Sequence, residues 1–292
     1  MPEGKPMKRL SSIGLFALLL ILSGCATAPR PMSISVEPEA NPWTHLNFNQ
    51  DPDRFQFAIL CDRTGGNRPG VFESAMWKLN LLQPEFVVSI GDLIQGYTQD
   101  EAEIETQWDE LEGLVQQLEM PFFYLPGNHD ISNKKMARKW RERFGRSYYH
   151  FVYRNVLFLC LNSEDPPPTH LSPEQIEYFS RVLRENQAVR WTLVFMHKPL
   201  WLQEEETGWE QVEALLSGRP YTVFAGHTHA YRLHHRLGQR YFVVATTGGV
   251  SDLRGPEFGR FDHLVWITMT EEGPRVANLL LDGILSEKVR SE

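Results

Sequence analysis

Short apolar runs, each followed directly by a glycine or a polar residue, recur along the chain from about residue 54. Five of them have the length and composition of buried strands. They are FQFAILC (55–61), EFVVSIG (85–91), PFFYLPG (121–127), WTLVFMH (191–197) and YTVFAGH (221–227). Side chains at the ends of such strands are far apart in sequence but converge in space on a rigid sheet. The pattern therefore predicts a site at the strand ends.

Stretches with apolar residues at helical spacing alternate with these runs and predict helices. They cover residues 71–82, about 99–118, 134–144 and 208–216. A further helix is predicted after Leu171, where Ser172 and Gln175 form a capping box and Pro173 takes the first helical position.

Other runs indicate more β-structure. YHFVYR and VLFLCLN flank Asn155 and predict a hairpin, and the last third of the chain contains RYFVVATT, DHLVWITM and RVANLLL. Mixed sheets with helices on both sides predict an α/β or α+β sandwich.

The first residues have the pattern of an export signal. Lys8 and Arg9 precede the apolar run 13–22, which is too short for a comfortable transmembrane helix. The run ends in Leu22-Ser23-Gly24-Cys25, which resembles the lipobox of bacterial lipoproteins. That resemblance implies a lipid anchor to the membrane at Cys25; an ordinary signal with a chance cysteine is the alternative.

These features divide the chain into three parts. We expect a lipoprotein signal peptide at 1–24, the lipidated cysteine and a flexible tether rich in Pro, Ala, Ser and Asn at 25–52, and one globular domain at 53–286. The expected location is the cell envelope, on the periplasmic side or outside the cell. Neither the leaflet nor the oligomeric state follows from the sequence.

The net charge bears on the expected partners, and the cysteines bear on whether a disulfide forms. The 292-residue chain has a formal charge of −8, so no overall field attracts nucleic acid, and no nucleic-acid partner is expected. A local cationic pocket for a phosphate stays compatible with that charge. Cys61 and Cys160 both fall in apolar runs, which favours buried free thiols over a disulfide bridge.

The strand ends carry metal-ligating residue types. In chain order these are Asp62, Gly91-Asp92, Gly127-Asn128-His129-Asp130, His197 and Gly226-His227-Thr228-His229. Two closely spaced cations need a bridging ligand, and the two oxygens of Asp92 suit that role. His227 and His229 stand two apart in a turn, so they can reach two different ions. Mixed oxygen and nitrogen ligation favours Mn, Fe or Zn over Ca or Mg.

The ordered set GD, GNHD, a lone histidine and GHTH resembles the calcineurin-like metallophosphoesterase family, over residues 57 to about 250. The resemblance implies a four-layer α/β/β/α sandwich with two mixed sheets and two divalent metal ions. It also implies hydrolysis of a small phosphorylated substrate, a phosphate monoester or diester, by attack of a metal-bridging hydroxide.

The family's roles carry over position by position. The resemblance implies that Asp62 binds the first metal and that Asp92 bridges both metals. It implies that Asn128, His197 and His227 complete the coordination of the second metal, and that His229 binds the first. His129 matches the residue that contacts the substrate and protonates the leaving group.

One position departs from the family pattern. The family usually begins with Asp-x-His, whereas Thr64 follows Asp62-Arg63 here. A hydroxyl is a poor ligand, so we expect a weakened first metal site, completed by water or by Asn67. Arg63 and Asn67 are candidates for phosphate contact, and ordinary loop solubility explains them equally well.

Two functions from different classes remain. The first is an envelope-anchored phosphoesterase; the second is an anchored metal- or phosphate-binding protein whose catalysis is weakened or lost at Thr64. The retained His129 favours the enzyme, because a binding protein has less need of a proton donor. The remaining histidines are expected in the core: His150, His170, His234, His235 and His263.

Overall fold

The computed structural model describes residues 53–284. By contact, the chain divides into a unit at 1–49 and a unit at 50–292. The predicted signal, Cys25 and most of the tether fall in the first unit, which lies outside the described residues. All of the described residues belong to the second unit.

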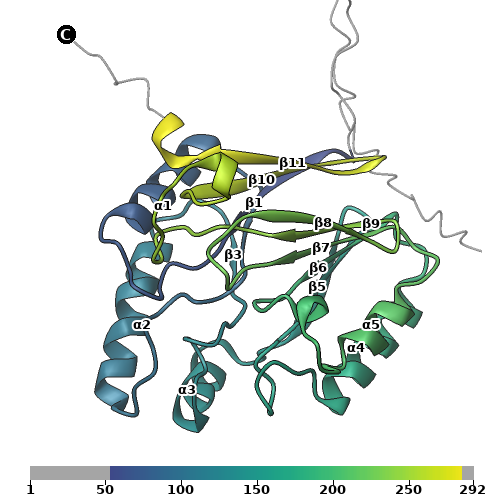
Figure 1. Cartoon of the computed structure of the whole chain (residues 1–292), viewed down its shortest axis with the longest axis horizontal. Coiled ribbons are helices and arrows are strands. Elements are labelled where there is room, and N and C mark those ends of the chain that lie inside the picture. The colour runs from purple at the N-terminus through teal and green to yellow at the C-terminus, as the bar shows by residue number, and fades with distance from the viewer. Residues whose placement is uncertain (1–52, 285–292) are drawn as a thin grey trace, which may run out of the picture. The chain divides into compact units, whose positions relative to one another are not determined.

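Two mixed sheets form the centre of this unit (Figure 1). The first has the order β11-β10-β1-β2-β3 and consists of β1 (Phe55–Leu60), β2 (Val87–Ser89), β3 (Phe122–Phe123), β10 (His263–Thr270) and β11 (Gly273–Leu280). Strands β1, β2 and β3 are parallel, whereas β10 is antiparallel to both of its neighbours.

The second sheet has the order β4-β5-β6-β7-β9-β8. Its strands are β4 (Tyr149–Tyr153), β5 (Val156–Cys160), β6 (Trp191–Phe195), β7 (Tyr221–Ala225), β8 (Arg232–Arg236) and β9 (Gln239–Val243). Strands β5, β6, β7 and β9 run parallel, and β4 and β8 close the two edges in antiparallel pairs. The predicted hairpin about Asn155 is the β4–β5 pair.

Helices cover the outer face of each sheet. On one side lie α1 (Val71–Leu82), α2 (Glu101–Val115) and α3 (Lys134–Phe144), and on the other α4 (Pro173–Glu185) and α5 (Trp209–Leu215) (Figure 1). Short 3-10 turns occur at Leu200–Leu202, Pro256–Phe258 and Leu281–Gly283.

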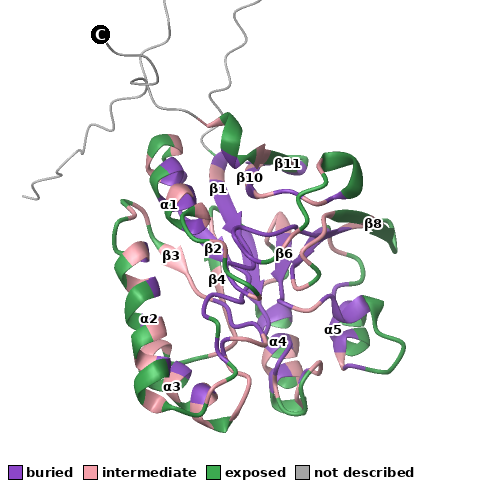
Figure 2. Ribbon diagram, turned by 60° about the vertical axis from the view of Figure 1, so that its left-hand side comes forward, coloured by how far each residue is buried: buried purple, intermediate pink, exposed green. Residues whose placement is uncertain are grey.

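Three apolar clusters account for this layering. One joins the two sheets through Phe57, Phe158 and Phe195, a second packs α4 and α5 on the second sheet, and a third packs α1, α2 and α3 on the first. Strands β1, β2, β5, β6, β7, β9 and β10 are buried along most of their length, whereas β3, β4, β8 and β11 are more exposed (Figure 2). The predicted α/β sandwich of four layers with two mixed sheets is confirmed.

Two predicted strands are much shorter than their apolar runs. The run 121–127 forms only the two residues of β3, and the run 85–91 only the three of β2. Pro121 and Pro126 bracket β3, and proline donates no ladder hydrogen bond. Beyond these short strands the chain leaves the sheet for the loops that carry Asp92 and Asn128.

The predicted capping box at α4 is half formed. The Ser172 hydroxyl accepts a hydrogen bond from the Gln175 backbone N–H at 3.2 Å, as expected. The Gln175 side chain does not return to the Ser172 N–H, which bonds to Asp165 instead. The Gln175 side-chain amide instead accepts from Asn162 N–H and donates to Asn162 O, and these bonds tie the helix to the end of β5.

Buried polar residues agree with the sequence only in part. Cys61 and Cys160 are buried free thiols, as predicted. Among the five histidines expected in the core, only His263 is buried, where Ala245 N–H donates to its Nε2. His150, His234 and His235 lie at intermediate or exposed positions, because β4 and β8 are edge strands with one face toward solvent. His170 is partly buried in the loop before α4.

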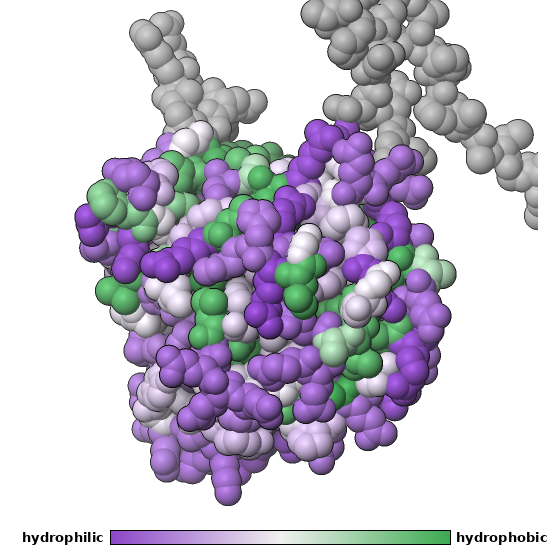
Figure 3. All heavy atoms as spheres, turned by 45° about the vertical axis from the view of Figure 1, so that its right-hand side comes forward, coloured by the Kyte–Doolittle hydropathy of each residue, from purple (hydrophilic) through white to green (hydrophobic). Residues whose placement is uncertain are grey.

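The face seen in Figure 3 is mostly hydrophilic, with smaller apolar areas scattered over it. Within residues 53–284, no helix has the length and apolar character needed to cross a bilayer.

A buried carboxylate joins the loops after β2 and β3. Asp130 accepts hydrogen bonds of 2.8 Å from the backbone N–H groups of Asp92, Leu93 and Gly127, and one of 3.0 Å from Ile94. Burial, and then the charge of Asp92, raise the pKa of Asp130 to about 7, against the lowering effect of these donors. Asp130 therefore fixes both loops relative to each other.

We predict that Asp130→Ala lowers the free energy of unfolding by at least about 3 kcal/mol, because it leaves several buried N–H groups without an acceptor. The measurement is urea denaturation with a chelator present, so that metal binding does not contribute. Asp252→Ala, at a half-exposed side chain, is the control and should change stability by less than about 0.5 kcal/mol. Equal stability of the two variants would contradict the role given to Asp130.

Candidate metal centre

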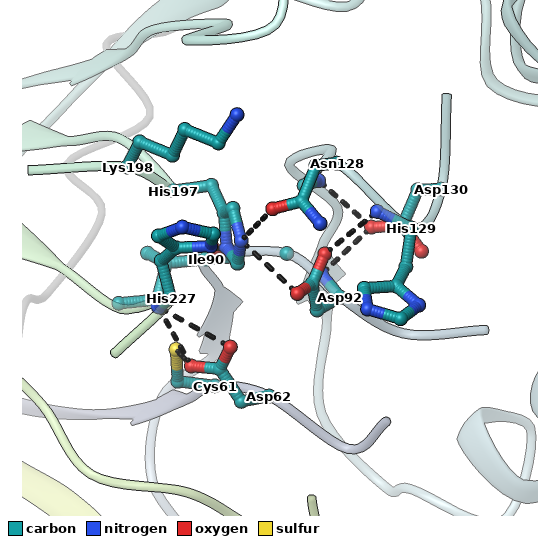
Figure 4. Close-up of polar contacts among 12 residues, drawn as sticks. Cys61, Asp62, Ile90, Asp92, Asn128, His129, Asp130, His197, Lys198 and His227 are labelled. Carbon is teal, nitrogen blue, oxygen red and sulfur yellow. Dashed lines mark hydrogen bonds and ion pairs between the residues drawn. The ribbon is translucent and has the colours of Figure 1, made fainter. Parts of the chain in front are cut away.

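The two sheets deliver the predicted ligands at the carboxyl ends of their parallel strands. Asp62 follows β1, Asp92 follows β2 and Asn128 follows β3 in the first sheet. His197 follows β6 and His227 follows β7 in the second. Because the sheets pack face to face, the two sets of strand ends meet at one edge of the sandwich (Figure 4).

Four of these positions have a backbone conformation that side chains seldom adopt. The φ angles are 50° at Asp62, 56° at Asp92, 72° at His227 and 52° at His229. Left-handed conformations at non-glycine residues cost free energy and gather at functional sites. They turn the chain sharply as it leaves each strand and aim the side chains into one space.

The first group of candidate ligands consists of Asp62, Asp92 and His229, whose ligand atoms all lie within 4.8 Å of one another. His229 Nε2 is 3.2 Å from Asp62 Oδ1. The carboxylate of Asp62 also accepts from the His227 backbone N–H, at 3.1 and 3.2 Å for its two oxygens.

The second group consists of Asp92, His197 and His227, again within 4.8 Å. His197 Nε2 lies 3.1 Å from Asp92 Oδ2 and 3.0 Å from Asn128 Oδ1 (Figure 4). Asp92 thus belongs to both groups, which is the arrangement a bridging carboxylate requires. The structure brings together all six residues predicted as ligands.

The imidazole rings are held from behind by backbone carbonyl groups. The Nδ1 atom of His197 is 3.0 Å from Ile90 O, and that of His229 is 2.7 Å from Val250 O. A carbonyl oxygen only accepts, so each Nδ1 keeps its proton, and in the neutral form of each ring the lone pair of Nε2 faces the site. Metal-binding histidines are oriented in this way.

The negative charges of the two aspartates at the site favour the binding of cations. Asp62 and Asp92 are 0% and 1% exposed, and within residues 53–284 no lysine or arginine pairs with either. Burial opposes ionisation of both Asp92 and His197, yet their mutual attraction lowers the pKa of Asp92 and raises that of His197. Among the described residues, protonated histidine is thus the only cation paired with the two carboxylates, and divalent metals fit this donor set.

Backbone-to-backbone contact between two loops explains two of the glycines. A Cβ atom at Gly91, where φ is 98°, would lie 2.5 Å from Gly127 N. A Cβ atom at Gly127 would lie 2.6 Å from Asp92 N. A side chain at either position would force apart the loops that carry Asp92 and Asn128.

His129 lies at the edge of this group with its ring turned in the same way. Its Nδ1 is 2.6 Å from Gln95 O, and its backbone N–H donates to Asp92 Oδ1 at 2.9 Å. The contact with a carbonyl keeps the proton on Nδ1 and leaves Nε2 as the other ring nitrogen. It faces the loop at Gly65, where a Cβ atom would be 3.6 Å from His129 Nε2 and 3.0 Å from His229 Cε1.

Thr64 stands apart from the ligands. Its side chain is buried, and its hydroxyl donates to Gln95 Oε1 at 2.7 Å. The hydroxyl is therefore occupied by a neighbouring amide. This leaves the first group with Asp62, Asp92 and His229, as the sequence predicts.

Arg63 does not join the site. Its guanidinium donates to Leu93 O at 3.1 Å, pairs with Glu110 on α2 and lies over the Phe72 ring. These contacts hold both terminal nitrogens of the guanidinium within the fold, and Nε is buried without a partner among the described residues. They argue against a phosphate contact. Asn67 is exposed in the loop after Gly66, and its contact with substrate stays a prediction.

Three residues near the site were not anticipated in this place. The Cys61 thiol contacts the Asp62 carboxylate, and its ligand atom lies within 4.8 Å of those of Asp62 and His197. Burial, and then the charge of Asp62, raise the pKa of this thiol well above its usual value. Only its position directly before Asp62 could have indicated this.

Lys198 and Tyr97 are the other two. Lys198 directly follows His197, and its Nζ donates to Glu164 Oε2 at 2.9 Å, which pairs its charge. Tyr97 accepts from Asn128 Nδ2 at 3.0 Å, and its ring meets that of His129 edge-on. No motif in the sequence marks either residue.

Comparisons with solved structures show where this fold recurs. A dimetal phosphatase from Danio rerio matches with a TM-score of 0.58 and 14% identity, over 78% of this chain and 99% of that one. A purple acid phosphatase from yellow lupin (Lupinus luteus) seeds matches with a TM-score of 0.58 and 15% identity, over 77% of this chain and 53% of that one. GAP50, "the anchor in the inner membrane complex of Plasmodium", matches with a TM-score of 0.59 and 14% identity, over 80% and 86%.

At these identities the structural matches show a shared fold alone. No curated protein matches the chain by sequence. The family model for calcineurin-like phosphoesterases matches residues 44–231, which contain all the candidate ligands. The chain belongs to the calcineurin-like phosphoesterase family.

Proposed function

We propose that this protein is a metal-dependent phosphoesterase that hydrolyses a small phosphate monoester or diester. The observation that carries the proposal is the pair of ligand groups that share Asp92. Two divalent ions, Mn, Fe or Zn, would be held by Asp62, Asp92 and His229 on one side and by Asp92, Asn128, His197 and His227 on the other. Bound there, two metals supply activation of a water as hydroxide and neutralisation of phosphoryl charge.

The protein's own residues prepare this centre for the reaction. Asp130 keeps the loops of Asp92 and Gly127 together through backbone hydrogen bonds. The carbonyl groups of Ile90 and Val250 hold the rings of His197 and His229 with Nε2 inward. The ligand positions are thus set before substrate arrives, which lowers the cost of ordering during the reaction.

His129 would protonate the departing oxygen. Its Nδ1 hydrogen bond to Gln95 O fixes the ring, and Nε2 is free to carry and release a proton on the side of Gly65.

We predict that His129→Gln lowers kcat by about 10²–10⁴ and leaves the metal content unchanged. The metal content should persist because the only contact of His129 with a ligand, the one to Asp92, comes from its backbone N–H. The measurements are hydrolysis of p-nitrophenyl phosphate and bis(p-nitrophenyl) phosphate, and metal per chain by elemental analysis. His235→Gln, at an exposed residue, is the matched control. Loss of metal in step with activity would assign His129 a structural role instead.

Thr64 allows a second test. We predict that Thr64→Val leaves the affinity for both metals unchanged, since its hydroxyl bonds to Gln95 and not to the site. Thr64→His, with Gln95→Ala to make room, should raise the affinity for the weaker metal by at least about tenfold. Residues that only hydrogen-bond to a metal ligand already change metal affinity by about that factor. Metal titration by calorimetry measures both affinities. A Thr64→Val variant that loses a metal would show that the hydroxyl is a ligand after all.

The weakened first group also supports the second candidate, a metal- or phosphate-binding protein without turnover. The same assays separate the two functions. Wild-type protein that binds metal and phosphate, but hydrolyses neither ester with added Mn²⁺, would favour the binding protein.

We propose, from the sequence alone, that Cys25 carries a lipid that anchors the domain in the cell envelope. Cys25→Ser should then move the protein from the membrane fraction to the soluble fraction after cell lysis, with the same hydrolytic activity in both forms. An unchanged distribution on immunoblots of the two fractions would rule the anchor out.

A further inference from the structure

A cavity of about 400 Å³ lies along helix α1, and no candidate metal ligand lines it. One wall consists of Gly70, Val71, Ser74 and Lys78 of α1 and its N-terminal turn. The segments 253–262 and 280–282 form the rest. The volume falls in the range of sites for small molecules.

Lys78 lines this cavity in an unusual state. The residue is only 8% exposed, and within residues 53–284 it forms no hydrogen bond and no ion pair. A surface lysine normally buries its stem and extends its ammonium group into water, which leaves much more of it exposed. The stem is therefore largely covered, and the ammonium group has no anion beside it among residues 53–284. A ligand with a negative charge that enters the cavity can pair with it.

The neighbouring charges leave Lys78 available. Asp262 also lines the cavity, but its carboxylate is bound by the Arg68 guanidinium at 2.6 Å and by the Gly248 N–H at 3.2 Å. Arg260 adds a second cation to the lining, and its contact with Asp252 is long, at 4.0 Å. Asp282 lines the cavity at an exposed position and forms no ion pair with Lys78 in the described residues.

The remaining lining is largely apolar, and the cavity is elongated. Val71, Leu253, Pro256, Phe261, Leu280 and Leu281 all contribute to it. Along α1 the cavity extends from Gly70 to Lys78, a rise of about 12 Å. A compact inorganic ion would leave most of this apolar surface in contact with water.

We propose that the cavity binds an elongated amphipathic anion, an alkyl chain ending in a carboxylate or a phosphate, with its charged end on Lys78. The apolar body would lie along α1 against Leu253 and Phe261. This site is separate from the metal centre, and the proposal does not depend on phosphoesterase activity.

The test is calorimetric titration of the full chain with octanoate and with octylphosphonate, in the presence of a chelator so that neither probe can coordinate a metal. Octanol and acetate, which lack the charge or the chain, are the control ligands. We expect at least one anionic probe to bind, and Lys78→Met to weaken it by at least about tenfold, the loss of one charge-assisted contact. The stronger probe identifies the carboxylate or the phosphate source.

Two further variants guard against misfolding and non-specific attraction. Lys78→Arg should retain binding because it keeps the charge, and Lys134→Met, at an exposed lysine of α3, should leave binding unchanged. Circular dichroism checks that each variant is folded. The proposal is overturned if neither probe binds at about 10 mM, or if Lys78→Met, folded as the wild type, binds as tightly as the wild type does.

Discussion

Two buried carboxylates, Asp62 and Asp92, impose the condition that the rest of the site satisfies. Burying a negative charge is costly unless a cation or several donors compensate it. Here the compensating groups are imidazoles and backbone N–H groups, and no lysine or arginine in the described residues pairs with either carboxylate. Divalent metals would complete this balance of charge, and the surrounding side chains present oxygen and nitrogen atoms suited to bind them.

That organisation comes from strand ends rather than from a single motif. Five parallel strands from two sheets end at one edge, and sharp turns with positive φ at Asp62, Asp92, His227 and His229 direct the side chains together. The strain is sustained by contacts around it, chiefly the Asp130 carboxylate between two loops and the close approach of Gly91 to Gly127. The cost of the turns is thus offset by buried hydrogen bonds.

The site is also asymmetric. The group around His197 and His227 has four donors, whereas the group around His229 has three and a threonine that bonds elsewhere. Two metals in such a centre would differ in affinity, and the weaker one would exchange more readily. The fold alone does not decide between catalysis and binding, because fold does not imply function. The orientation of His129 is what favours catalysis.

Local patterns of a few residues were enough to predict the candidate ligands, their order and the alternation of strands and helices. The sequence also identified the missing histidine at Thr64 and the two buried thiols. Tertiary structure alone decided which groups meet: Gln95 with Thr64, Glu110 with Arg63, and Ile90 O with His197, across 31, 47 and 107 residues of chain. Such pairings depend on how the two sheets pack, so no local pattern records them. For the same reason the sequence did not reveal that the Arg63 guanidinium has partners within the fold, that four of the five histidines expected in the core are partly buried or exposed, or that Lys78 lines a cavity.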